Sequence, residues 1–224
     1  MRQFGKTLMR SLSAAALLFL GACGAPDDPQ EEAPGATADE LQSPPLAESD
    51  MKRIKAPAGM PVPWDQPDST GLFDERGKCG ATAVANVLKL YGNTNVSPAK
   101  ADADGVRWWV GARGINIEAY FRQKQPQLGC TLEHPAEGPG FLRAHLDAGH
   151  PVMVWFNMSG GFLGSHWVTV VGHRGTGAAE VAVVMSWGAY YTIPMSKLDA
   201  AWRNVYAIRR PSLVCSARTN LIAR

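Results

Sequence analysis

The sequence lacks the features that mark several common classes of protein. Its apolar run at residues 14–20 is too short to span a bilayer as a stable anchor. The spacing of its Cys and His residues fits no zinc pattern, and no glycine-rich phosphate loop is present. There is no internal repeat and no sign of a second domain. The sequence therefore predicts neither a bound metal nor a cofactor.

The short apolar run belongs to an export signal at residues 1–22, in which basic residues precede the run. The run ends in the letters LGAC, and small residues before a cysteine resemble the lipobox of bacterial lipoproteins. This resemblance implies cleavage before Cys23 and lipidation of that cysteine. The alternative is an ordinary secretory signal with an incidental cysteine. The lipoprotein interpretation implies a lipid anchor in the bacterial cell envelope, facing the periplasm, and Gly24 favours the outer membrane over the inner one.

Residues 23–55 are predicted to form a lipidated, disordered, acidic tether. Positions 24–50 hold eight acidic residues and no Lys or Arg, a composition that buries too little apolar surface to offset the entropy of ordering. Residues 56–224 then form one domain with a full core. From position 51 the charge is 19 Lys/Arg minus 12 Asp/Glu, or +7. Because these basic residues are scattered, a solvated surface is favoured and nucleic acid is not expected as a partner.

The two halves of the expected domain differ in hydrophobic pattern. Apolar residues recur at helical spacing after Cys79. Further helices are expected over residues 98–109, 115–123 and 138–150. Runs of β-branched and aromatic residues, typical of strands, lie at 151–156, 166–172, 180–187, 190–193 and 205–210. Helices followed by strands predict an α+β domain with an antiparallel sheet.

The cysteine count leaves one thiol over. With Cys23 assigned to a lipid, the other three cysteines form at most one disulfide, which an oxidising periplasm permits. Cys130 and Cys215 lie in loop-like surroundings, whereas Cys79 opens a helix. The most economical pairing therefore joins Cys130 to Cys215 and leaves Cys79 free. Other pairings stay open, and in those that include Cys79 the cysteine would be structural.

Cys79 has the placement of a nucleophile. A thiol attacks carbonyl groups as a thiolate, and a helix N-terminus lowers the thiol pKa. Gly80 keeps side-chain bulk away, and the free N–H groups there could hold an oxyanion. Among the five histidines, His166 follows a glycine-rich turn and begins a strand, from which it can project towards a helix N-terminus. His173 lies about 20 Å away along that strand and cannot share the site.

These residues carry a resemblance to a family. The letters CGATAVANVLKLYG and, later, GGFLGSHWVTVVG resemble the papain-like cysteine peptidases of the bacteriocin-processing (double-glycine leader peptidase-like) type. The resemblance implies a papain-like fold, in which an N-terminal helical part carrying the nucleophile packs on a C-terminal antiparallel sheet. It implies that Cys79 is the nucleophile and His166 the general base and acid. An acyl-enzyme would form on attack, with a peptide, a protein or a peptidoglycan stem peptide as substrate.

The sequence departs from this family at two places. The family's orienting Asn or Asp falls at Met185, whose thioether accepts no useful hydrogen bond from an imidazole. Ser186 could replace it only through a one-residue slip, which would turn its side chain to the other sheet face. The family's oxyanion Gln falls at Phe73, and Gln66 lies further upstream. These departures support an alternative, a catalytically weak or inactive papain-like domain that binds peptides or proteins in the envelope.

Overall fold

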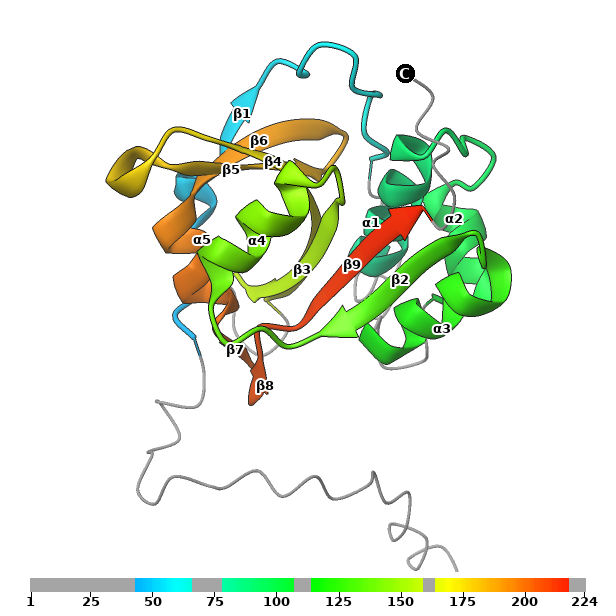
Figure 1. The fold of residues 1–224 in the computed structure, drawn as a ribbon. Helices are drawn as coiled ribbons and strands as arrows, with labels where there is room; N and C mark the ends of the chain where they lie inside the picture. Colours follow the sequence, from blue (N-terminus) through cyan, green and yellow to red (C-terminus); the bar gives the residue numbers. More distant parts are fainter. Residues whose placement is uncertain (1–42, 66–77, 107–113, 159–163, 218–224) are drawn as a thin grey trace, which may run out of the picture. The chain divides into compact units, whose positions relative to one another are not determined.

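The structure is a computed structural model that describes residues 43–65, 78–106, 114–158 and 164–217. All of these residues belong to one compact unit, Ala36–Arg224. At its centre is a seven-stranded sheet of order β1-β6-β5-β4-β3-β9-β2, in which every neighbouring pair is antiparallel (Figure 1). The expected α+β class is therefore confirmed. The export signal and Cys23 lie outside the described residues.

The elements of the described part are as follows. The helices are α1 (Lys78–Leu90), α2 (Pro98–Ala101), α3 (Gly114–Lys124), α4 (Gly138–Asp147) and α5 (Met195–Trp202). The strands of the large sheet are β1 (Lys52–Ile54), β2 (Leu128–Glu133), β3 (Val152–Asn157), β4 (Ser165–Arg174), β5 (Val181–Ser186), β6 (Ala189–Pro194) and β9 (Ser212–Ala217). A separate two-stranded hairpin is formed by β7 (Asn204–Val205) and β8 (Ile208–Arg209).

Helices cover both faces of the large sheet (Figure 1). On one face α1, α2 and α3 enclose a core that includes Val84, Phe121 and Trp167. On the other face α4 and α5 enclose a second core that includes Val168 and Trp202. Successive strand residues point to opposite faces, so Trp167 and Val168 of β4 serve different cores. The distinction between the α1 face and the α4/α5 face decides the geometry of the candidate site.

Helix α1 is the element that the sequence predicts after Cys79, and the structure confirms it. Its small and branched apolar residues are buried along nearly the whole helix. Gly92, with a φ of 82°, follows its end, and the N–H of Asn93 donates to the carbonyl of Leu88 at 2.9 Å. Near its start, the carbonyl of Ala83 accepts a 3.1 Å hydrogen bond from Thr169 Oγ1 of β4. The first turns of α1 therefore lie against β4.

Two elements differ from the sequence-based expectation. The strand expected over residues 205–210 is wrong, because Tyr206 and Ala207 have positive φ values of 51° and 63° and reverse the chain between β7 and β8. The helix expected over 98–109 ends as a regular α-helix at Ala101. An irregular turn follows, in which Gly105 has a φ of 103°, and residues 107–113 lie outside the described part.

Cys130 and Cys215 form a disulfide, and Cys79 is the free cysteine among the described residues. The pair lies directly opposite on strands β2 and β9, so the expected loop-like surroundings are wrong. The two segments are 85 residues apart in sequence. Their strand character therefore comes from pairing with each other, which local sequence does not reveal.

The folded part begins earlier than the expected boundary at position 56. Ser43 and Leu46 are buried, with 6% and 2% of their surfaces exposed. The N–H of Leu46 donates to the carbonyl of Asn157 at 2.8 Å, and the N–H of Ser43 donates to the carbonyl of Asn204 at 2.9 Å. The side-chain amide of Asn157 also donates to the carbonyl of Ser43 at 3.0 Å. The expected tether is therefore too long, because its overall composition hid two buried apolar residues, Leu46 and Met51.

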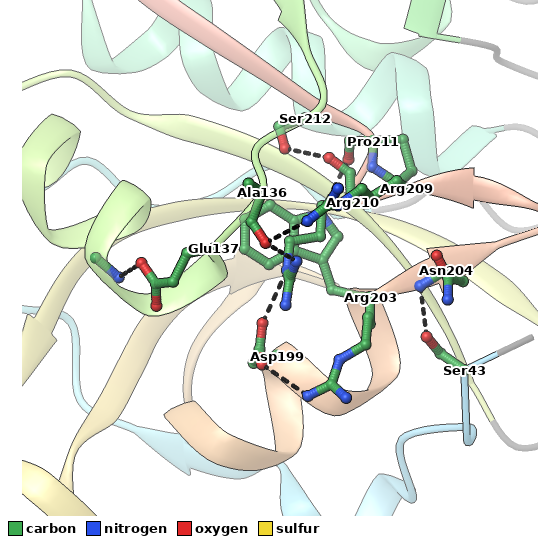
Figure 2. A network of polar contacts seen from close by, with 12 residues as sticks. Ser43, Ala136, Glu137, Asp199, Arg203, Asn204, Arg209, Arg210, Pro211 and Ser212 are labelled. Atoms are coloured by element: carbon green, nitrogen blue, oxygen red, sulfur yellow. Dashed lines mark hydrogen bonds and ion pairs between the residues drawn. The ribbon is translucent and has the colours of Figure 1, made fainter. Parts of the chain in front are cut away.

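A buried arginine links α5 to the segment before α4 (Figure 2). Arg210 is 6% exposed and its Nε lies 3.0 Å from Oδ1 of Asp199. It also donates to the carbonyl of Ala136 at 2.5 Å, and Arg209 donates to the same carbonyl at 2.8 Å. These contacts hold Arg210 at a positive φ of 37°. They fix the chain where the β7–β8 hairpin ends and β9 begins.

Candidate functional site

Cys79 is the second residue of α1, and 9% of its surface is exposed. The backbone N–H of Trp167 donates a hydrogen bond to its sulfur, and the N–H groups of Gly80 and of Cys79 itself lie nearby. Trp167 follows His166 directly in β4. The structure thus brings the expected nucleophile to the strand that carries the expected base.

The protonation state of Cys79 follows from two opposed effects. Burial raises the pKa of the thiol above its ordinary value, because an apolar surrounding disfavours the thiolate. The three N–H groups favour the thiolate and lower the pKa, to a smaller extent than burial raises it. The thiol is therefore protonated at neutral pH in this arrangement.

The imidazole of His166 is enclosed, with 7% of the residue exposed. Its Nε2 lies 2.8 Å from Oγ of Ser186. The indole of Trp187 stacks on the ring with 4.3 Å between centroids and 10° between planes, and Phe156 meets it edge-on at 6.1 Å. Burial lowers the pKa of His166 from its ordinary value of 6.5 to about 3. The imidazole is therefore neutral at neutral pH.

Ser186, and not Met185, contacts the ring of His166. Met185 pairs with Thr169 and packs in the cluster with Val183 and Tyr190 on the α1 face. Ser186 lies on the opposite face, which His166 shares because it precedes Trp167 by one residue. The expectation that Ser186 needs a register slip is therefore wrong. It rested on placing His166 on the face that Met185 occupies.

Cys79 and His166 approach β4 from opposite faces of the sheet. Cys79 packs in the α1-face core with Trp167, whereas Phe156, at the imidazole edge, packs in the α4/α5-face core. Within the described residues, no hydrogen bond joins the Cys79 sulfur to a nitrogen of His166. His166 lies just beyond the end of the β4–β5 ladder, which starts at the pair Thr169–Met185. A working pair needs Nδ1 of His166 to come within hydrogen-bond reach of the sulfur.

A tight turn places Trp187 over the imidazole. Trp187 and Gly188 have positive φ values of 42° and 67° and connect β5 to β6 as a two-residue hairpin turn. The N–H of Gly188 donates to the carbonyl of Trp64 at 3.2 Å. The N–H of Trp64 in turn donates to Oδ1 of Asn86 in α1, at 2.7 Å. The residues around Trp64 therefore link the turn to the nucleophile helix.

The other histidines lie away from this site. His173 Nε2 is 2.9 Å from Oδ1 of Asp147, and His134 Nδ1 is 2.9 Å from the carbonyl of Arg209. The rings of His145 and His150 are near each other, with 6.1 Å between centroids.

Sequence reasoning missed Phe156 as a neighbour of the imidazole, because its position opposite His166 depends on the β3–β4 register. The letters WG after Ser186 are the one local signal for the turn that carries Trp187. Gln66 and Phe73, considered for the oxyanion, lie outside the described residues.

The described part also gives two negative findings. No group of three or more His, Cys, Asp or Glu residues there is arranged to hold a metal ion. None of the helices there combines the length and the apolar character that a membrane crossing requires.

Comparisons of the chain with models of known protein families and with curated proteins give no match. The site is therefore characterised by its own geometry.

Proposed function

We propose that this chain is a cysteine peptidase or amidase with a papain-like domain. One observation carries the proposal: the free thiol of Cys79, at the start of α1, accepts a hydrogen bond from Trp167, the residue next to His166. Amide hydrolysis by a cysteine needs a thiol at a helix N-terminus and an imidazole that can reach it. A hydroxyl on the far ring nitrogen orients the imidazole. Ser186 supplies the hydroxyl, at 2.8 Å from Nε2.

The chemistry proceeds through an acyl-enzyme. Because both groups are neutral at rest, Nδ1 of His166 takes the thiol proton as the sulfur of Cys79 attacks the amide carbon. The N–H groups of Cys79 and Gly80 stabilise the oxyanion. The imidazolium then gives its proton to the leaving nitrogen, and the C–N bond breaks. Water, deprotonated by His166, cleaves the thioester and restores the thiol. Ser186 holds the ring through Nε2 during both steps.

The proposal includes a location. Lipidation of Cys23 would anchor the domain in the bacterial cell envelope, facing the periplasm, with the outer membrane favoured by Gly24. Substrates there would be peptides, proteins or peptidoglycan stem peptides. The disulfide between Cys130 and Cys215 fits an oxidising compartment. The membrane partner is the lipid bilayer itself, reached through the anchor.

A second candidate is a catalytically weak or inactive papain-like domain that binds peptides. The observation that supports it is the uncharged state of Cys79 and His166. The pKa of Cys79 is raised and that of His166 is lowered, so neither is charged, and no hydrogen bond joins them within the described residues.

Alkylation of Cys79 distinguishes these candidates. The full chain is treated with iodoacetamide across a range of pH, and modification of the Cys79 peptide is followed by mass spectrometry. If the two residues share a proton, His166→Gln shifts the pH profile, whereas His134→Gln, in an exposed site, leaves it unchanged.

The same preparations are then incubated with a pool of peptides. Cleavage that disappears in Cys79→Ala and His166→Gln supports the hydrolase. A pH profile indifferent to His166, together with no cleavage, would leave the peptide-binding candidate.

A further inference from the structure

Residues 60–65, which we call the strap, run from the β1 side of the sheet to α1 (Figure 1). The N–H of Trp64 donates to Oδ1 of Asn86 in α1 at 2.7 Å, and the carbonyl of Trp64 accepts the N–H of Gly188 at 3.2 Å. The ammonium of Lys89, also in α1, lies 4.5 Å from the centre of the Trp64 ring. The backbone of one residue therefore ties the nucleophile helix to the turn between β5 and β6.

A second contact holds the strap to the sheet. Oη of Tyr190, in β6, donates to the carbonyl of Pro61 at 2.7 Å, and Met60 packs against the cluster that contains Tyr190. The two side chains that bond to the strap are buried, with 0% of Asn86 and 1% of Tyr190 exposed, whereas Val62 in the strap is 68% exposed. The strap is thus a surface segment whose backbone is held by buried polar side chains.

The joint between the strap and α1 is incompletely paired. Nδ2 of Asn86 and Nε1 of Trp64 are both buried, and neither has a hydrogen-bond partner within the described residues. Burial of a donor without a partner is unfavourable, because the group has lost its hydrogen bonds to water. Both donors would regain water if the strap lifted. We therefore expect this joint to open more readily than a fully paired contact would.

The turn that the strap holds is strained as well. Trp187 has a φ of 42°, a backbone region that bulky side chains rarely adopt. Such a conformation persists where surrounding contacts hold it in place. Here those contacts are the hydrogen bond from Gly188 to the strap and the stacking of the indole on His166. Release of the strap would remove one of the two.

The closed turn leaves the catalytic groups enclosed, with 7% of His166 and 9% of Cys79 exposed. The described side chains that meet the imidazole carry no charge: Phe156 from β3, Ser186 from β5 and Trp187 from the turn. Charged groups at the strap are Lys89, over the Trp64 ring, and Asp65, beside Gly188. Burial lowers the pKa of His166 to about 3, whereas a general base works best with a pKa near the working pH. The enclosed imidazole is therefore a poor base.

We propose that the strap is an autoinhibitory contact: by joining Asn86 to Gly188 it holds the turn closed over His166, and its release exposes the imidazole and lets substrate reach the thiol. As regulation of cleavage this inference rests on the proposed function, whereas the opening of the turn does not. Asn86 is a positioning residue in this device, since it acts on His166 through the strap and the turn.

Alkylation of Cys79 in the full chain tests the strap. Asn86→Ala removes the acceptor of the Trp64 N–H and should speed the reaction with iodoacetamide at pH 7 about fivefold, the shift that one hydrogen bond gives to an opening equilibrium. The control Asn93→Ala, just after the end of α1, removes a contact with Gln125 and should leave the rate unchanged.

A second variant attacks the strap from the sheet. Tyr190→Phe removes the hydroxyl that bonds to Pro61 and keeps the ring in the core, so it should also speed alkylation. Far-UV circular dichroism and urea unfolding establish that each variant is folded. If Asn86→Ala does not fold, Tyr190→Phe decides the result.

The imidazole gives a readout that needs no thiol. In the full chain carrying Cys79→Ala, an NMR titration measures the pKa of His166. Addition of Asn86→Ala should raise this pKa towards 6.5, because the ring gains water. A merely structural role of Asn86 would lower the free energy of unfolding of the chain without moving the pKa.

Three results would overturn the proposal. One is an unchanged alkylation rate together with an unchanged His166 pKa in Asn86→Ala and Tyr190→Phe. Another is slower alkylation or slower cleavage in a folded variant, since the strap would then support the site instead of restraining it. The third is an equal gain in Asn93→Ala, which would show that any loss of a polar contact around α1 has the same effect.

Failure of the proposed function gives a different pattern. If Asn86→Ala speeds alkylation and raises the pKa of His166 but no peptide is cleaved, the hydrolase falls and the closure of the turn by the strap stands. If cleavage depends on Cys79 and His166 but proceeds equally in the unmodified chain and in Asn86→Ala, the hydrolase stands and the autoinhibitory strap falls.

Discussion

Nε2 of His166 lies 2.8 Å from Oγ of Ser186, across the end of the β4–β5 ladder. Both side chains are buried on the α4/α5 face of the sheet. This contact occupies Nε2, so Nδ1 is the ring nitrogen left for proton transfer in the proposed mechanism. In the proposed mechanism Ser186 is a positioning residue, because it would act on the substrate through His166.

Replacement of Ser186 by Ala should lower kcat/KM for a cleaved peptide about tenfold, the value of one lost hydrogen bond to a catalytic group. Ser186→Thr keeps the hydroxyl and should restore most of the activity. The control Ser216→Ala removes a hydroxyl from β9, where its 3.4 Å contact is with the carbonyl of Gly129. A structural role alone would not move the pH profile of Cys79 alkylation, whereas Ser186→Ala should. Equal effects of both alanine variants on that profile would contradict the role of Ser186.

The pH dependence of stability should report on His166. Its pKa is lowered to about 3 in the folded state from an ordinary value of 6.5, so protonation favours the unfolded chain. The associated stability is present above about pH 6.5 and is lost as the pH falls towards 3, by at most about 1.4 kcal/mol per pH unit. Urea unfolding at several pH values measures this slope. His166→Gln cannot titrate, so its free energy of unfolding should fall less steeply between about pH 6.5 and 3 than that of the unmodified chain. Identical slopes for the two proteins would show that the imidazole titrates freely in the folded state.

Leu46 should contribute to the stability of the domain, although composition assigns it to the tether. It is 2% exposed and packs in the α4/α5-face core. Leu46→Ala should lower the free energy of unfolding by about 2–4 kcal/mol, because it removes a buried aliphatic side chain and leaves a cavity. Glu48→Ala, at an exposed position in the same segment, should change it by less than about 0.5 kcal/mol. Denaturant unfolding measures the free energy of unfolding of both variants. Similarly small effects of the two would show that Leu46 is not part of the folded core.

The buried pair of Asp199 and Arg210 should be sensitive to loss of one partner. Asp199→Asn removes the carboxylate charge that pairs with the buried Arg210 guanidinium and leaves neutral oxygens as its described partners. We expect a loss of about 3 kcal/mol in the free energy of unfolding. Asp147→Asn, whose carboxylate is 69% exposed beside His173, provides the control and should cost far less. Equal losses in the two variants would mean that burial of Arg210 does not depend on Asp199.

The helix at Cys79 and the strands β3 to β6 could be predicted because their signals are local. An amphipathic period and runs of β-branched residues describe a short segment by itself. Strands β2 and β9 could not, since each gains its pairing from the other across the disulfide between Cys130 and Cys215. Helix α5 was missed for a related reason. It has no side-chain N-cap and begins directly after the strand residue Pro194, so sequence provides no clear start signal.

The sequence by itself determined which groups are available: a single thiol at a helix start and a histidine at a strand start. Spacing and residue type are enough for that, because both depend on local backbone structure. The tertiary structure alone decided which partners those groups have. The register of β4 against β5 places Ser186, rather than Met185, against His166, and the packing of α1 puts Cys79 on the other face of the sheet. A strand's side chains alternate with a period of two, so one residue of register decides the face, and only long-range pairing fixes that register.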